Sequence, residues 1–115
     1  MAYSDIVTLQ IRDALADHGV SGLTEKRMMG GLVFLISGNM LLSHKTLKTD
    51  TEQFMFRVGK DSEGEALTIT GTRPMIHGER RMSGFLFIGE ADCAPAIFKR
   101  LLAMSLRYVK GLPPK

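Results

Sequence analysis

The chain has 115 residues, the length of a single domain whose core can be stable without disulfides or a metal. An apolar fraction of 44% and a charged fraction of 23% are typical of a globular protein and argue against disorder. The net charge of +3 allows contact with nucleic acid or an acidic protein but does not demand it. The single cysteine, Cys93, excludes an internal disulfide and fits a reducing compartment.

Nothing in the sequence points to a membrane. No apolar run is long enough to span one. Residues 1–5 lack the basic and apolar parts of a secretory signal. The sequence therefore predicts a cytoplasmic protein without a membrane partner.

The chain begins with a predicted helix over residues 4–18. Ser4 is suited to cap its first turn, and Asp5 adds favourable charge beside the helix dipole. Gly19 is the expected stop. A stripe at three- and four-residue spacing marks the buried face: Val7, Ile11, Ala14, Leu15 and His18.

The stretch after this helix predicts the centre of a sheet. Residues 24–29 form a weakly alternating first strand. Two apolar runs follow, Leu32–Ile36 and Met40–Leu42, separated by Ser37-Gly38-Asn39. Gly and Asn tolerate the positive φ that tight turns require, so we expect a hairpin that is buried on much of both faces.

A polar segment, Lys45–Glu52, separates this hairpin from the next strand and is expected to be a mobile loop. The strand Gln53–Val58 follows. Its alternation places Phe54, Phe56 and Val58 on one face, and Met55 and Arg57 on the other.

The next segment predicts a short helix at residues 61–67 and a turn at Gly71–Pro74. Pro74 has no N–H to donate, so any strand that begins there belongs at the edge of the sheet. Ser83–Ile88 is the clearest of the remaining strands.

A long helix, Cys93–Lys110, is predicted to close the chain, with Asp92 as its cap and Pro95 in its first turn. Its mainly apolar face comprises Ile97, Phe98, Leu101, Leu102, Ser105, Tyr108 and Val109. Its basic arc comprises Lys99, Arg100, Arg107 and Lys110. Because the elements are grouped rather than alternating, the sequence predicts one α+β domain over residues 1–115. An antiparallel sheet of five to six strands would carry the N- and C-terminal helices on one face.

Five short motifs follow one another in an order and spacing that can be compared with known families. They are Arg27-Met28-Met29-Gly30-Gly31, Gly38-Asn39-Met40, Thr72-Arg73-Pro74-Met75, Met82-Ser83-Gly84-Phe85 and Leu112-Pro113-Pro114-Lys115. Together they resemble the TfoX N-terminal domain family, whose larger members regulate bacterial competence. The chain departs from the family pattern at Met29, at Arg80-Arg81-Met82 and in an expanded 45–52 loop. The resemblance implies an open antiparallel sheet with flanking helices, similar to small secretion chaperones, and no established catalytic residues.

Several residue groups are of types that can bind ligands or catalyse reactions, but each has a simpler structural interpretation. Gly30-Gly31 is followed by a strand rather than by the helix that a phosphate loop needs, so a turn is favoured. Cys93 beside a helix start could be reactive, but no histidine lies nearby in sequence to activate it. His18, His44 and His77 lack metal-ligand spacing and are interpreted as structural or surface groups. We therefore expect no metal and no cofactor.

Residues 80–87 faintly resemble an RNA-recognition strand, in which a basic residue and Gly precede alternating aromatics. Ser83 and Leu86 depart from that pattern. The sequence interpretation places Phe85 and Phe87 in the core.

The leading hypothesis is a non-enzymatic protein-interaction domain, with a role in gene regulation of the TfoX type. The partner, which could be a second copy of the chain, would bind an exposed sheet face or edge. The candidate interaction surface comprises Arg27, Met29, Arg57, Arg80 and Arg81. The alternative is weak nucleic-acid binding through Arg80, Arg81 and the basic arc Lys99, Arg100, Arg107 and Lys110, for which a solvated outer helix face is the simpler reading. A third option is an enzyme with a cleft near Cys93.

Overall fold

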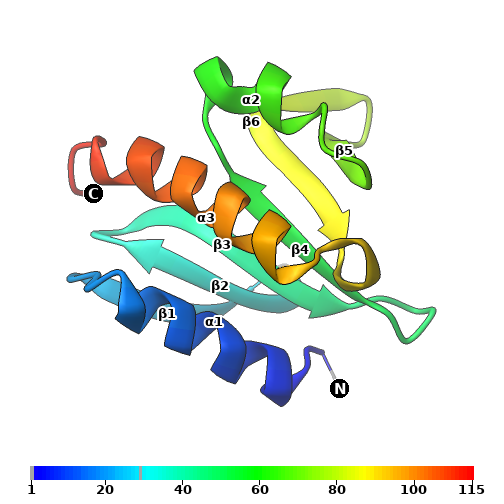
Figure 1. Cartoon of the computed structure of the whole chain (residues 1–115), viewed down its shortest axis with the longest axis horizontal. Coiled ribbons are helices and arrows are strands. Elements are labelled where there is room, and N and C mark those ends of the chain that lie inside the picture. The colour runs from blue at the N-terminus through cyan, green and yellow to red at the C-terminus, as the bar shows by residue number, and fades with distance from the viewer. Residues whose placement is uncertain (1, 29) are drawn as a thin grey trace.

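The computed structural model describes residues 2–28 and 30–115 and confirms the α+β fold predicted from the sequence. Six antiparallel strands form one sheet in the order β1-β2-β3-β4-β6-β5 (Figure 1). The elements in chain order are α1 (Asp5–Asp17), β1 (Leu23–Met28), β2 (Gly31–Ile36), β3 (Asn39–Thr46), β4 (Glu52–Arg57), α2 (Lys60–Ala66), β5 (Thr72–His77), β6 (Arg80–Gly89), η1 (Glu90–Asp92) and α3 (Pro95–Lys110).

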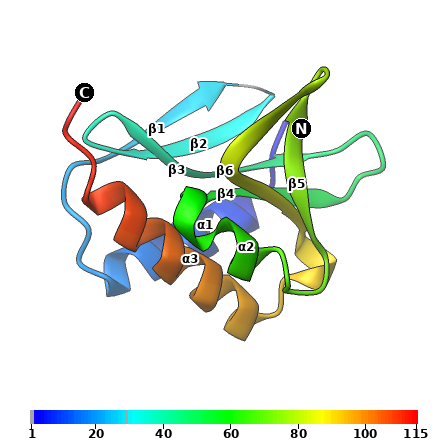
Figure 2. The same ribbon diagram turned by 90° about the horizontal axis from the view of Figure 1, so that it is seen from above.

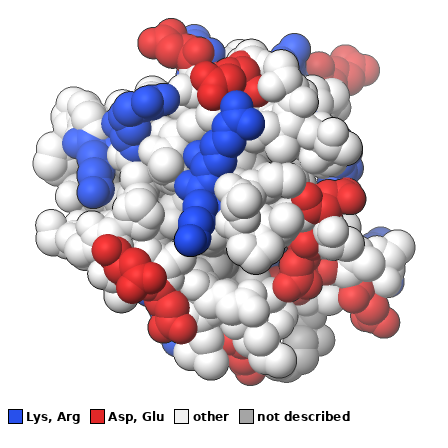
Figure 3. All heavy atoms as spheres, viewed as in Figure 1, with Lys and Arg blue, Asp and Glu red and all other residues white. Residues whose placement is uncertain are grey.

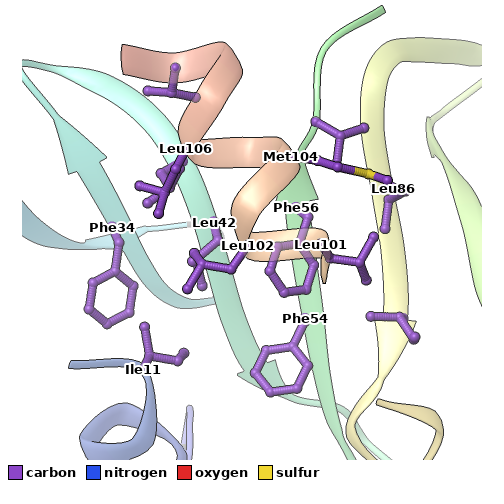
Figure 4. Close-up of a cluster of buried hydrophobic side chains, with 14 of the residues drawn as sticks. Ile11, Phe34, Leu42, Phe54, Phe56, Leu86, Leu101, Leu102, Met104 and Leu106 are labelled. Carbon is purple, nitrogen blue, oxygen red and sulfur yellow. The ribbon is translucent and has the colours of Figure 1, made fainter. Parts of the chain in front are cut away.

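All three α-helices lie on the same side of the sheet (Figure 2). We call this side the covered face and the opposite side the open face. Side chains from α1, α3 and alternate strand positions meet between the layers (Figure 4). Phe34, Phe56, Leu86, Ile11 and Leu101 are fully buried there. The core therefore depends on both end helices and on the covered face of the sheet.

The first helix begins as predicted. The Val7 backbone N–H donates to Ser4 Oγ at 3.3 Å, so Ser4 is the cap of α1. Val7, Ile11 and Leu15 are buried. His18 is the C-terminal cap residue and is exposed, so it is a capping rather than a core residue.

The start of the last helix was predicted incorrectly. Asp92 ends the short 3₁₀ segment η1, and the N-cap of α3 is Ala94, which makes no side-chain cap hydrogen bond. The helix begins at Pro95 rather than at Cys93. Proline has no N–H and a fixed φ, both of which suit the first helical position.

The central hairpin turns through two residues, one fewer than predicted. Ser37 and Gly38 have φ values of 51° and 85°, and Asn39 already pairs with Ile36. Two positive φ angles in succession match the twist of the flanking strands, which explains this tight connection. All six residues of β2 are buried, as the sequence predicts.

Two segments predicted as irregular are partly strand. β3 runs to Thr46 and β4 starts at Glu52, so the predicted 45–52 loop shrinks to residues 47–51. Lys45 pairs with Gln53, and Thr46 with Glu52. The predicted turn at Gly71–Pro74 is also wrong, because β5 begins at Thr72. Pro74 does lie on an edge strand, as its missing N–H requires.

Motifs far apart in sequence meet at the hairpin turn. The Asn39 side-chain amide donates to the Pro113 carbonyl at 2.9 Å, and the Lys115 backbone N–H donates to the Ser37 carbonyl at 2.8 Å. A Cβ at Gly38 would lie 2.9 Å from Lys115 Cβ. These residues therefore hold the C-terminal segment against the sheet, and their role is architectural.

Candidate interaction groove

One row of residues crosses the open face through all six strands. The register pairs each member with the next, in the order Lys26, Val33, Ser43, Met55, Phe87 and Arg73. The centre of the row is mainly apolar, while both ends are basic. Val33 is 0% and Met55 3% exposed, although the helices lie on the other side.

This face is hollowed. Figure 2 shows β3 and β4 nearest the helices, with β1, β2 and the tip of the β5–β6 hairpin extending away from them. A groove of about 470 Å³ lies on the open face. Its apolar lining comes from Met55, Met75, Ile76 and Phe87, and its polar lining from Ser43, Lys45, Gln53 and His77. Ile76 is 59% exposed, so a partner can contact it directly.

An arginine spans one end of the groove. Arg73 of β5 donates through Nη2 to Gln53 Oε1 of β4 at 2.7 Å. The strand between them, β6, presents Gly89 opposite Gln53, and glycine has no side chain to obstruct the contact. Of the described residues that line the groove, none is acidic. The site thus combines an apolar floor with positive charge.

Phe85 and Phe87 were expected in the core, and this is wrong. They alternate with Leu86 and Ile88, which are fully buried on the covered face, so both aromatic rings belong to the open face, where they are half-buried. The Arg57 guanidinium lies 5.3 Å from the centre of the Phe85 ring and 5.5 Å from that of Tyr108. Arg57 also donates to the Met40 carbonyl at 3.4 Å.

The four described residues of the predicted interaction surface, Arg27, Arg57, Arg80 and Arg81, do not form one surface. Arg27 pairs with Leu32 and so lies on the covered face, where its Nε donates to the Tyr3 hydroxyl at 3.2 Å. Arg57 points to the open face, because strand register rather than residue type decides the face. Arg80 and Arg81 begin β6, and Arg81 lies 3.4 Å from Glu63 of α2. Met29 lies outside the described residues.

The basic arc of α3 is partly neutralised. Arg100 and Glu65 form an exposed ion pair at 3.1 Å. Lys99, Arg107 and Lys110 are also exposed, which is compatible with a solvated helix face. Figure 3 shows basic and acidic side chains interspersed on this side of the molecule. Among the described residues, no shared contact joins the basic arc to Arg80 or Arg81.

A buried hydroxyl, imidazole and carboxylate are arranged in line between α1 and the sheet. His44 Nε2 lies 3.0 Å from Thr8 Oγ1, and His44 Nδ1 lies 2.6 Å from Glu52 Oε2. Burial acts to raise the pKa of Glu52, but hydrogen bonds from Thr46, His44 and the Ser4 N–H outweigh it and lower that pKa. The His44 side chain is 0% exposed and that of Glu52 5%, so a substrate has no access. The group fastens α1 to β3 and β4.

Cys93 lies in a smaller hollow of about 300 Å³ with residues of α1 and α3. Burial, helped by the negative charge of Glu90, raises the pKa of its thiol to about 11. A thiol with so high a pKa is almost entirely protonated at neutral pH and is a poor nucleophile. Within the described residues, no three His, Cys, Asp or Glu side chains are grouped so as to hold a metal ion.

Comparison of the chain with known protein families, with curated proteins and with solved structures gave no match. In the described part of the chain, no helix is both long and apolar enough to cross a membrane. The site is therefore interpreted from its own geometry.

Proposed function

We propose that this protein is a non-enzymatic interaction domain whose protein partner binds in the groove of the open face. The observation that carries the proposal is the apolar lining of a groove that no helix covers in the described part of the chain. Open sheet faces and grooves are common sites for partner segments. An apolar patch that remains accessible in a small domain is typical of an interaction site.

Two further features support an interaction role over catalysis. The thiol of Cys93 is held protonated, and the Thr8–His44–Glu52 group is sealed from solvent. The ordered motifs that resemble the TfoX N-terminal domain family support a role in gene regulation through protein contacts. We also propose the cytoplasm as the compartment, because the one cysteine has no partner for an internal disulfide.

The test is a pull-down from cell extract with the wild-type protein and Ile76→Glu. Ile76 is 59% exposed, so the substitution adds charge to the groove without disturbing the core. Leu9→Glu on α1 is the matched control, since Leu9 is 58% exposed and lies away from the groove. We expect Ile76→Glu to lose a partner that Leu9→Glu retains. A partner retained by both variants, or lost only with Leu9→Glu, would contradict the proposal.

The runner-up is binding of single-stranded nucleic acid. The observation in its favour is that Phe85 and Phe87 belong to the open face, close to Arg57 and Arg73, because bases stack on aromatic rings flanked by cations. Such binding must weaken steeply with salt. Undetectable affinity for DNA and RNA at low ionic strength would remove this alternative.

A second copy of the chain is another candidate partner, because β1 and β5 are edge strands. Sedimentation equilibrium of wild type and Ile76→Glu separates this case from a different partner. A dimer that dissociates only in Ile76→Glu would identify the groove as the contact between copies.

A further inference from the structure

We infer that the groove takes an extended peptide segment that carries apolar side chains beside acidic ones. This inference rests on the proposed function and adds the chemistry of the partner.

The charged side chain among the described lining residues of the groove is that of Lys45. Arg73 donates to the lining residue Gln53, and Lys26 stands at the far end of the residue row. Glu79 lies in the turn beyond His77, and there Arg80 pairs with His77 across the hairpin. Glu52, although adjacent to Gln53, is buried and bound to His44. A segment with carboxylates is therefore attracted, and one with Lys or Arg is repelled.

The apolar floor favours a protein segment over a nucleic acid. Met55, Met75 and Ile76 are flexible or aliphatic side chains, which fit apolar anchors of different shapes. Stacking of bases needs open aromatic rings instead. Phe85 is already paired with the Arg57 guanidinium, which leaves Phe87 as the aromatic ring that lines the groove among the described residues.

The size of the groove also fits a short segment. Its volume of about 470 Å³ is enough for a few anchoring side chains rather than a folded surface. The groove crosses β3, β4, β6 and β5, so a bound segment would run across the strands. Lys45 is the register partner of Gln53, and Arg73 donates to the Gln53 side chain, so carboxylates of the segment would be attracted to this end of the groove.

The experiment is selection from a display library of random dodecapeptides against the wild-type protein, with Ile76→Glu and Leu9→Glu selected in parallel. We expect peptides that combine apolar residues with Asp or Glu to be enriched by wild type and Leu9→Glu, but not by Ile76→Glu. For a synthetic copy of one enriched peptide, we expect Lys45→Glu to weaken binding about tenfold, which corresponds to the loss of one favourable charge contact.

Each other outcome has a defined meaning. Groove-dependent peptides that are neutral or basic would overturn this inference and leave the proposed function standing. Enrichment that Ile76→Glu does not disturb, or no enrichment at all, would overturn the inference, and the pull-down would then judge the function separately. A random single-stranded DNA oligonucleotide is measured alongside. Binding of that oligonucleotide that is lost in Ile76→Glu would assign the groove to nucleic acid instead.

Discussion

The two faces of the sheet are built from the same strands but differ in burial and in composition. On the covered face, Phe34, Phe56 and Leu86 are sealed beneath the helices. On the open face, the row through Val33, Met55 and Phe87 is apolar only in its middle and ends in Lys26 and Arg73. Alternation in β4 and β6 thus directs one set of side chains beneath the helices and the other set to a face that no helix covers in the described part of the chain.

The largest expected effect separates the two faces by stability. Phe56→Ala should lower the free energy of unfolding by about 3–5 kcal/mol, because Phe56 is fully buried and a cavity would remain. Phe87→Ala on the half-buried open face should cost only about 1–2 kcal/mol. Urea denaturation of both variants measures the difference. Equal losses would show that the open face is as much core as the covered one.

An intermediate effect comes from the polar group at one end of the covered face. Glu52→Gln should destabilise the protein by about 2–3 kcal/mol, since charge-assisted hydrogen bonds from His44, Thr46 and the Ser4 N–H are weakened. Chemical denaturation at neutral pH measures this loss. The free energy of unfolding of Gln53→Glu, in which a carboxylate replaces the amide on the open face, is measured for comparison. A negligible change in Glu52→Gln would contradict a fastening role for the group.

The lowered pKa of Glu52 predicts how the stability of the protein depends on pH. The folded-state pKa of Glu52 is lowered, so its contribution to stability is complete above the unfolded value of about 4.3. That contribution is lost as the pH falls through the lower, folded-state pKa. Wild type should therefore lose stability more steeply than Glu52→Gln in acid, as thermal unfolding across this range would show. Parallel curves would contradict the assignment.

The smallest expected effect lies on the rim of the groove. Ile76→Glu should change the free energy of unfolding by less than about 0.5 kcal/mol, because exposed positions contribute little. Leu9→Glu should behave alike. Thermal unfolding of the two variants measures this change. It is also the control for the pull-down, since a destabilised Ile76→Glu could lose partners by unfolding alone.

Much of the fold follows from local sequence signals. The cap at Ser4, the hairpin around Gly38 and the edge position of Pro74 each have a backbone reason that needs no distant partner. The start of α3 was missed because Asp92 and Pro95 are both acceptable near a helix start, and the 3₁₀ turn before Pro95 depends on tertiary context.

The groove was not predicted, for a physical reason. In β6 both alternating sets, Phe85 with Phe87 and Leu86 with Ile88, are apolar, so their period cannot say which set meets the helices. The faces of Arg27 and Arg57 depend on register across several strands. Glu52 was assigned to a loop because its hydrogen-bond partner His44 lies on the neighbouring strand β3, beyond the 47–51 loop, and sequence alone does not show that contact. Fold-level signals are local, whereas the site is assembled from four strands.

The most direct test of the groove is amide chemical-shift mapping of the full chain during titration with an enriched acidic peptide. We expect the largest shifts at Met55, Ile76 and Phe87, with α1 and α3 nearly unchanged. Shifts centred on Leu9 of α1 or on the basic arc of α3, with the groove silent, would contradict it.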